Sequence, residues 1–262
     1  MSSSQGFVLA DSMDTCRLTA QGPLAGMAST RAPGLSVEKA REYNLKELHI
    51  ARNRDDPRRV MPPIRATDRV ILDVGCGAGQ TLIASDISPN VVRVGIDIDH
   101  VGLVQGHELD DKIAFVCGKG EVLPFKDESF DMVVARVSLP YMRTRPALTE
   151  FCRVLRDDGA LWLTLHHFPF VAREFVRSLA RLDVVRAAYR FYVLTNGVSS
   201  HVIGREFACP YTGGRVESFQ TRGGMTRLLH NLGFVNVKAD TTGSFFIVTA
   251  TKRNGSRVAG RL

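Results

Sequence analysis

A buried strand that leads directly into a glycine-rich turn constrains this fold more than any other feature of the chain. Residues 70–74 are apolar apart from Asp73, and the chain continues as Gly75-Cys76-Gly77-Ala78-Gly79. Glycine lets a backbone turn tightly and approach a ligand closely, and a helix that begins there directs its first N–H groups toward that ligand. The sequence therefore predicts a strand–turn–helix ligand site.

Short apolar runs alternate with helix-length segments after this turn. The runs are rich in β-branched residues and apolar on both faces, as a parallel sheet covered by helices requires. A short Thr-Thr-Gly-Ser turn at 241–244 predicts that the last two strands form an antiparallel hairpin. We expect an α/β fold with a doubly wound, Rossmann-like, mostly parallel seven-stranded sheet and a helical insertion after strand five. The expected strands are 70–74, 91–96, 113–116, 132–137, 160–165, 234–239 and 245–251.

One domain accounts for most of the 262 residues. Residues 1–35 lack periodicity and are expected to form a loosely attached tail, and residues 253–262 a second tail. Ser36 is expected to cap a helix over 37–50 at the start of a domain that spans 36–252. Within that domain, we expect 168–215 to form a helical substrate lid, with irregular structure at Asn196-Gly197 and 211–214.

The spacing of the glycines separates two nucleotide-site patterns. A dinucleotide fingerprint has the form G-x-G-x-x-G, whereas Gly75, Gly77 and Gly79 give G-x-G-x-G, and Gln80 follows. An acid, Asp73, precedes the glycines and is not part of the dinucleotide pattern. This string resembles the first motif of class I S-adenosylmethionine-dependent methyltransferases, in which an acidic residue is followed by G-x-G-x-G.

A carboxylate is expected at the end of the second strand, in the string Val94-Gly-Ile-Asp97-Ile98-Asp99. Such an acid lies beside the glycine turn and can accept hydrogen bonds from both ribose hydroxyls of a nucleoside. Asp97 follows Gly77 by about twenty residues, which is the usual separation. Asp99 is better placed to cap the next helix. In the family that the sequence resembles, the acid at the position of Asp97 binds the ribose of S-adenosylmethionine.

Two further segments extend the resemblance over about residues 69–165. Gly118-Lys119-Gly120-Glu121-Val-Leu-Pro-Phe is similar to the family segment G-D-A-E-x-L-P-F, but Lys119 replaces the aspartate that meets the adenine amino group. An ammonium group cannot accept that hydrogen bond. Residues 148–163 are similar to the segment that leads into the fifth strand, and there Glu150, Arg153 and Gly159 are expected to be structural.

The resemblance implies S-adenosylmethionine as the cofactor and a set of residues that contact it. These residues are Asp73, Gly75, Cys76, Gly77, Gly79, Asp97, Ile98, Lys119, Gly120, Glu121 and Arg136.

The methyl acceptor is expected at the carboxyl edge of the sheet. Tyr141, His166 and His167 follow strands four and five there, and we consider them candidates for substrate contact or for removal of a proton. A histidine at a strand end also commonly bonds a loop carbonyl. Arg173, Arg177 and Arg181 lie four residues apart, which suggests peripheral membrane contact through a basic helix over 173–190, or a solvated face.

The five cysteines are scattered without a CxxC pair, which argues against a disulfide framework or a zinc site. The N-terminus has no signal-peptide pattern, so we expect a cytoplasmic location. A small-molecule acceptor, lipophilic or aromatic, fits the helical insertion. The net charge of +7 leaves RNA methylation as an alternative, although nucleic acid is disfavoured as a partner. Lys119 leaves a second alternative, a cofactor-binding protein without catalysis.

Overall fold

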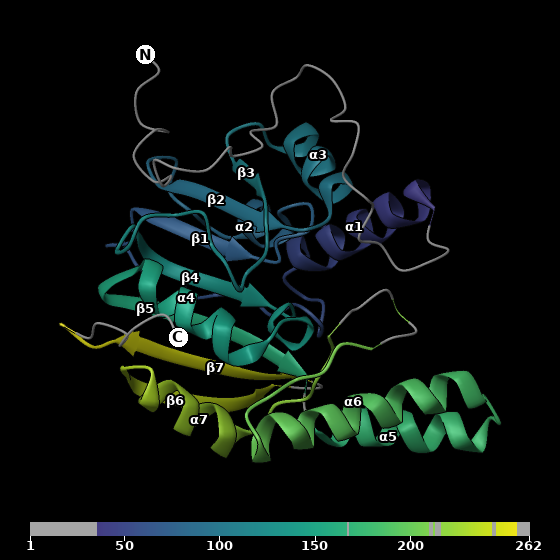
Figure 1. Ribbon diagram of the computed structural model, residues 1–262. Coiled ribbons are helices and arrows are strands. Elements are labelled where there is room, and N and C mark those ends of the chain that lie inside the picture. The colour runs from purple at the N-terminus through teal and green to yellow at the C-terminus, as the bar shows by residue number, and fades with distance from the viewer. Residues whose placement is uncertain (1–35, 167, 210–211, 213–215, 243–244, 256–262) are drawn as a thin grey trace.

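A seven-stranded sheet with helices on both faces forms the centre of the protein (Figure 1). This computed structural model describes residues 36–166, 168–209, 212, 216–242 and 245–255. The strand order is β3-β2-β1-β4-β5-β7-β6, with β1 to β5 parallel and β7 antiparallel to both of its neighbours. The strands are β1 (Val70–Val74), β2 (Val92–Asp97), β3 (Ala114–Cys117), β4 (Phe130–Arg136), β5 (Leu155–His166), β6 (Phe234–Thr242) and β7 (Phe245–Lys252).

The predicted doubly wound fold with its antiparallel C-terminal strands is confirmed, and the expected strands lie within a few residues of the observed ones. The largest difference is β5, which begins at Leu155 rather than at residue 160. Leu155 pairs with Phe130, and the register then shifts before Ala160 pairs with Met132. The residues between them form an irregularity in which Asp158 has a φ of +59°. A sequence pattern identifies only the regular part of a strand with such an irregularity, which is why the predicted start of β5 was too late.

Two hydrophobic cores lie on opposite faces of the sheet, because successive residues of a strand point to opposite sides. On β1, Leu72 and Val74 belong to the core that includes Phe151 of α4, whereas Ile71 belongs to the core that includes Leu103 of α3. The helices are α1 (Val37–Arg52), α2 (Gln80–Ala84), α3 (His100–Leu109), the 3₁₀ turn η2 (Leu139–Tyr141), α4 (Thr144–Val154), α5 (Phe168–Ala180), α6 (Val184–Val202) and α7 (Arg222–Asn231).

The expected helix caps are present. Ser36 accepts a hydrogen bond from the N–H of Lys39 at the start of α1, and Asp99 accepts one from Val101 at the start of α3. Arg153 also has the structural role expected of it, because its guanidinium bonds Glu150, Asp127 and the carbonyls of Leu123 and Phe125.

The helical insertion after β5 is a pair of packed helices, α5 and α6, which extend beyond the sheet (Figure 1). The prediction of an irregular stretch at Asn196-Gly197 is wrong, since both residues lie inside α6. The Asn196 side chain donates to the Glu217 carbonyl at 2.9 Å and accepts from the Phe207 N–H at 2.7 Å. These tertiary bonds replace the local turn that Asn-Gly usually forms. Within the described residues, no helix is long and apolar enough to cross a membrane.

Candidate functional site

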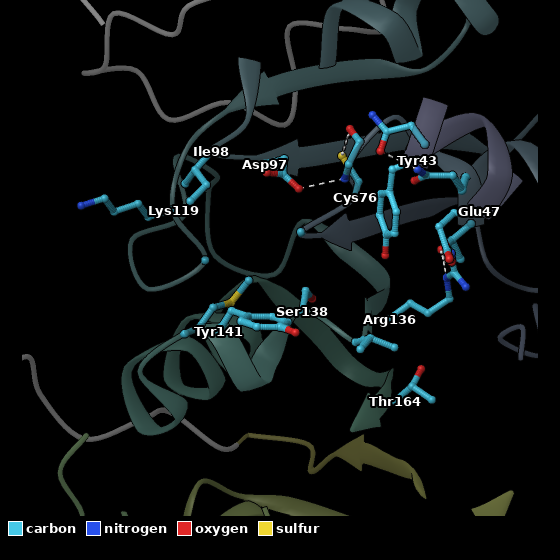
Figure 2. A pocket seen from close by; sticks show the side chains of 18 of the residues that line it. Tyr43, Glu47, Cys76, Asp97, Ile98, Lys119, Arg136, Ser138, Tyr141 and Thr164 are labelled. Atoms are coloured by element: carbon cyan, nitrogen blue, oxygen red, sulfur yellow. Dashed lines mark hydrogen bonds and ion pairs between the residues drawn. The ribbon is translucent and has the colours of Figure 1, made fainter. Parts of the chain in front are cut away.

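A cavity of about 1170 Å³ opens at the carboxyl ends of β1, β2 and β4. Its walls come from the glycine turn after β1, from the end of β2, from residues 118–121 after β3 and from residues 136–143 after β4. This is the edge at which ligands bind in open α/β sheets, next to the reversal of strand order between β1 and β4. Figure 2 shows Asp97, Ile98 and Lys119 at one end and Tyr43, Glu47, Arg136 and Thr164 at the other.

The backbone amides of the glycine turn are already used inside the protein. The N–H groups of Gly75 and Cys76 both donate to the Ile96 carbonyl, and that of Gly79 donates to the Cys76 carbonyl. The Gly77 N–H donates to Asp97 Oδ2 at 2.8 Å. The expectation that free amides face the ligand is therefore wrong for these four groups, because β2 supplies acceptors for three of them and the turn itself supplies the acceptor for Gly79. Such a turn offers a ligand close approach and packing rather than an anion site.

Asp97 is fixed at the cavity wall by two hydrogen bonds to the backbone. Besides the bond from Gly77, Oδ1 accepts the Asp99 N–H at 2.8 Å. Burial raises the pKa of this carboxyl, and the bonds from Asp99 and Gly77 act in the opposite direction. The carboxylate thus has a defined orientation at the end of β2, where a nucleoside ribose is expected.

Two of the glycines have different structural requirements. Gly75 lines the cavity at a φ of +73°, and a Cβ there would lie 2.2 Å from the Ser138 Cβ. Gly79 has a φ of +75° but is not among the lining residues, and its Cβ would lie 2.8 Å from Cζ of Phe115. The structure therefore places Gly79 against the core rather than at the cavity.

Asp73 lies beneath the turn and is buried. Neither of its carboxylate oxygens has a hydrogen-bond partner among the described residues. Burial raises the pKa of Asp73 to about 7, and the nearby Arg136 and Thr81 oppose that rise. Burial likewise raises the pKa of the Cys76 thiol well above its usual value, so Cys76 lines the cavity as a neutral group.

Ile98, Lys119, Gly120 and Glu121 all line the end of the cavity near Asp97. Lys119 lines the cavity, and its side chain is exposed and points away from the middle of the cavity (Figure 2). Glu121 accepts the Arg143 N–H at 3.0 Å, which holds its carboxylate in the wall.

Arg136 defines the opposite end of the cavity. Its guanidinium donates to the Thr81 hydroxyl at 3.2 Å and forms an ion pair of 3.6 Å with Glu47 of α1. The next residue, Val137, has a φ of +59°, which a β-branched residue rarely adopts. Thr164 on β5 completes this end. Its hydroxyl is buried and has no hydrogen-bond partner among the described residues.

The three candidate catalytic residues have different positions. Tyr141 is half-exposed in η2 and lines the cavity. His166 is the last residue of β5, at the carboxyl edge of the sheet. His167 lies outside the described residues.

Sequence analysis missed the part of the cavity wall that α1 provides, which consists of Tyr43, Asn44, Lys46, Glu47 and Ile50. Ala208 and Thr212 also line the cavity and lie within the predicted lid region, and Val216 lies directly after it. The α1 residues lie on one helical face, at spacings of three or four, which is the signal that could have identified them. The lining residues from the predicted lid region lie after α6, and none of those recorded lies in α5 or α6.

A carboxylate at the end of β2, beside a glycine turn at the switch point of a doubly wound sheet, defines a nucleoside-binding protein. The residues present fit S-adenosylmethionine. Asp97 can accept hydrogen bonds from ribose hydroxyls, and turn amides that are already paired suit a cofactor without phosphate. The buried carboxyl of Asp73, which has no hydrogen-bond partner among the described residues, would favour positive charge nearby when it is ionised.

Comparison with known proteins agrees with this geometry. Residues 72–163 match a family model described as a methyltransferase domain. An uncharacterized methyltransferase, YcgJ of Bacillus subtilis, is 36% identical over 127 residues, which are 45% of this chain and 49% of that protein. The 27-O-demethylrifamycin SV methyltransferase of Amycolatopsis mediterranei is 36% identical over 110 residues, 39% of this chain and 40% of that protein. The chain thus matches half or less of the length of these relatives.

A solved structure extends the likeness to the fold. Phosphoethanolamine N-methyltransferase 2 of Haemonchus contortus, in complex with S-adenosyl-L-methionine, has a TM-score of 0.55 and 12% identity, covering 87% of this chain and 61% of that one. Residues 72–163 thus match a methyltransferase domain, and the chain has the fold of an S-adenosylmethionine-dependent methyltransferase, as the sequence motifs predicted.

Proposed function

We propose that this protein transfers the methyl group of S-adenosylmethionine to a small molecule that enters the cavity at its Arg136 end. The observation that carries the proposal is one continuous cavity that joins Asp97, at the nucleoside end, to a second polar end with Arg136 and Thr164. A cofactor and a second reactant can therefore occupy the same enclosed space. We also propose the domain limits 36–252 and a cytoplasmic location.

The paired amides of the glycine turn support a sulfonium cofactor over a dinucleotide. A pyrophosphate group is normally held by free backbone N–H groups at such a turn. Here Gly75, Cys76, Gly77 and Gly79 donate to protein acceptors. Binding of a pyrophosphate would break those bonds, whereas S-adenosylmethionine has no phosphate.

The described residues divide into cofactor and acceptor groups. Asp97 would hold the ribose, and Ile98, Gly120 and Glu121 would surround the adenine. Asp73 would favour the cationic part of the cofactor through its buried carboxylate. Tyr43, Tyr141 and Thr164 would contact the acceptor, with the Thr164 hydroxyl able to bond a polar group on it.

The cofactor supplies a methyl group on a positively charged sulfur, which keeps the bonding electron pair when the methyl group leaves. The protein has to align the acceptor atom with that methyl group and exclude water. The parts of the cavity wall that α1 and Ala208, Thr212 and Val216 provide would exclude water. Tyr141, His166 or His167 could take a proton from the acceptor, although the chemistry does not require a base in every case.

The relatives favour a small acceptor. They include the 27-O-demethylrifamycin SV methyltransferase and a phthiotriol/phenolphthiotriol dimycocerosates methyltransferase of Mycobacterium tuberculosis. We therefore propose a hydroxylated lipophilic or aromatic compound as the acceptor class.

Calorimetric titration with S-adenosylhomocysteine, with NADH as the comparison, tests the cofactor site. We expect micromolar binding of S-adenosylhomocysteine, no binding of NADH and loss of binding in Asp97→Ala. Asp86→Ala, which changes an exposed acid outside the cavity, is the control. Preference for NADH, or equal binding by Asp97→Ala, would contradict the cofactor assignment.

Transfer of a radiolabelled methyl group tests the acceptor class. We expect turnover on hydroxylated lipophilic or aromatic compounds and none on folded RNA. Turnover on RNA alone would favour nucleic-acid methylation. Cofactor binding without turnover on either class would favour a non-catalytic binding protein.

A further inference from the structure

The helices α5 and α6, which form a helical hairpin, expose several large apolar side chains to solvent. Leu182 in the connecting turn is 86% exposed, and Val184 and Val185 at the start of α6 are 75% and 83% exposed. Further along α6, Phe191 and Val198 are 57% and 54% exposed. Large apolar side chains exposed in such number along one pair of helices are typical of an interaction site.

The spacing on α6 places these residues on one face. Val184, Phe191 and Val198 lie seven residues apart, and Ala188, Thr195 and Val202 fall between and after them, also seven apart. Thr195 does not interrupt the apolar character, because its hydroxyl bonds the carbonyls of its own helix at Phe191 and Tyr192. Val176 and Leu179 of α5 are also exposed, at 62% and 51%. We call these exposed apolar residues, together with Leu182 and Val185, the apolar face of the hairpin.

Arginines accompany this face on α5. Arg173, Arg177 and Arg181 lie four residues apart and are exposed. Arg177 pairs with Glu174, whereas no ion pair within the described residues involves Arg173 or Arg181. Between residues 168 and 207 there are six arginines against three acids. Exposed arginines beside apolar side chains suit a surface that carries negative charge at its polar boundary.

The shape and position of the hairpin favour a bilayer over a groove in another protein. Figure 1 shows α5 and α6 projecting beyond the sheet, with their connecting turn at the far end. A projecting convex element can enter the boundary between headgroups and acyl chains, and there the whole apolar face is covered at once.

A second copy of the chain is a weaker match. In the hairpin of a second copy, Glu174 and Asp183 would already pair with Arg177 and Arg186 of that copy. These two carboxylates are therefore not available to Arg173 and Arg181 of the first copy. A helix packed along the α6 seam would also leave Leu182 and Val185 exposed, since both lie outside the seven-residue repeat.

We infer that the α5–α6 hairpin binds the surface of a membrane that contains anionic phospholipids, with its apolar face in the interface and Arg173 and Arg181 at the phosphate groups. This interaction differs from the predicted contact through a basic helix face, because the apolar residues at the turn provide the insertion. It does not depend on methyl transfer and can be measured without cofactor.

Sedimentation of the full chain with vesicles tests the inference. We expect binding to vesicles of phosphatidylcholine mixed with phosphatidylglycerol, and much weaker binding to phosphatidylcholine alone. Leu182→Asp combined with Val185→Asp should reduce binding by more than about tenfold. Both positions are exposed, and an acid in the first turn of α6 does not oppose the helix. Val37→Asp combined with Leu45→Asp, at exposed positions of α1, is the matched control and should bind normally.

The charge component is tested separately. Arg173→Gln combined with Arg181→Gln should reduce binding to anionic vesicles by about fivefold for each arginine. Arg222→Gln combined with Arg227→Gln removes two exposed arginines from α7 and should have little effect.

Absence of vesicle binding by the wild-type chain would overturn the inference, as would equal losses in the hairpin variants and their controls. Analytical ultracentrifugation distinguishes a membrane from a second copy of the chain as the partner of the hairpin. A dimer that dissociates in Leu182→Asp with Val185→Asp would identify a second copy as the occupant, and would also overturn the membrane assignment.

Discussion

Glu47 of α1 and Arg136 at the end of β4 form an ion pair of 3.6 Å that connects the N-terminal helix to the sheet across the edge of the cavity. Arg136 also donates to Thr81, so the guanidinium is held from two sides. The pair therefore fixes both a wall of the cavity and the position of the Arg136 charge in it.

Removal of this pair should lower both ligand affinity and stability by small amounts. Because both side chains retain some solvent exposure, we expect Glu47→Gln to lower the free energy of unfolding by less than about 1 kcal/mol. The affinity for S-adenosylhomocysteine should fall about threefold, in line with a partly screened ion pair. Urea unfolding and calorimetry measure the two quantities.

Glu108→Gln is the matched control, because Glu108 pairs with Arg41 and thereby connects α1 to α3 outside the cavity. It should leave the affinity unchanged. An equal loss of affinity in both variants would show that the two ion pairs act only by holding α1 in place, and that the Glu47–Arg136 pair has no separate effect at the cavity.

The unpaired carboxyl of Asp73 should make stability depend on pH. Its pKa is raised by burial to about 7 from an ordinary 3.8, so between these values the folded protein keeps a proton that the unfolded chain releases. Stability should therefore fall as pH rises from about 4 to 7, by up to about 1.4 kcal/mol per pH unit. Asp73→Asn should lack this component and be the more stable protein at pH 8.

Urea unfolding of the ligand-free protein from pH 4 to 8 checks this expectation. Asp131→Asn is the control, because the pKa of Asp131 is lowered and its effect on the pH dependence of stability has the opposite sign. Burial alone would raise the pKa of Asp131, but hydrogen bonds from Arg156 and from the Arg69 and Val70 amides lower it. Its stabilising contribution should be lost as pH falls. Parallel profiles for wild type and Asp73→Asn would contradict the assignment.

Gly79→Ala should reduce stability without changing cofactor affinity. The residue has a φ of +75°, and its added Cβ would lie 2.8 Å from the Phe115 ring. We expect a cost of about 1–3 kcal/mol in thermal or urea unfolding. Phe115→Leu should offset part of that cost in the double variant. Loss of affinity at unchanged stability would instead place Gly79 at the ligand.

Lys119→Asp should strengthen cofactor binding. In this family an aspartate at the position of Lys119 meets the adenine amino group, and a carboxylate can accept that hydrogen bond. We expect a gain of up to about tenfold for S-adenosylhomocysteine in calorimetry, the size of one hydrogen bond to a charged group.

The gain should disappear with S-inosylhomocysteine, in which an oxygen replaces the amino group. Lys112→Asp makes the same charge change at an exposed position outside the cavity and should bind both ligands normally. Equal gains for both ligands would indicate a general charge effect.

The strands, the glycine turn and Asp97 could be predicted because local pattern determines them. β-Branched runs identify buried strands, and the G-x-G-x-G string followed by an acid at the end of the next strand identifies a nucleoside site. The pairing of the turn amides could not be predicted. It depends on the register that places Gly75 and Cys76 beside Ile96, which is a contact between two strands.

The α1 wall was missed for a different reason. Apolar periodicity identifies the buried face of a helix, and α1 has such a face at Ala40, Leu48 and Ala51. Tyr43 and Glu47 lie at the side of that face, and the position of α1 relative to β4 makes them part of the cavity. A lid was predicted over 168–215, but nothing in the local sequence indicated that Ala208 and Thr212, rather than residues of α5 and α6, would line the cavity.

The strand order has a consequence for synthesis of the protein on the ribosome. β6 is made before β7, yet within the described sheet it pairs with β7 alone, which lies between it and β5. Until Phe245–Lys252 has emerged, β6 has no partner and the outer edge of β5 is open. The nascent chain therefore exposes an unpaired strand edge late in translation, and we expect this interval to be the one in which the protein is most prone to misassociation.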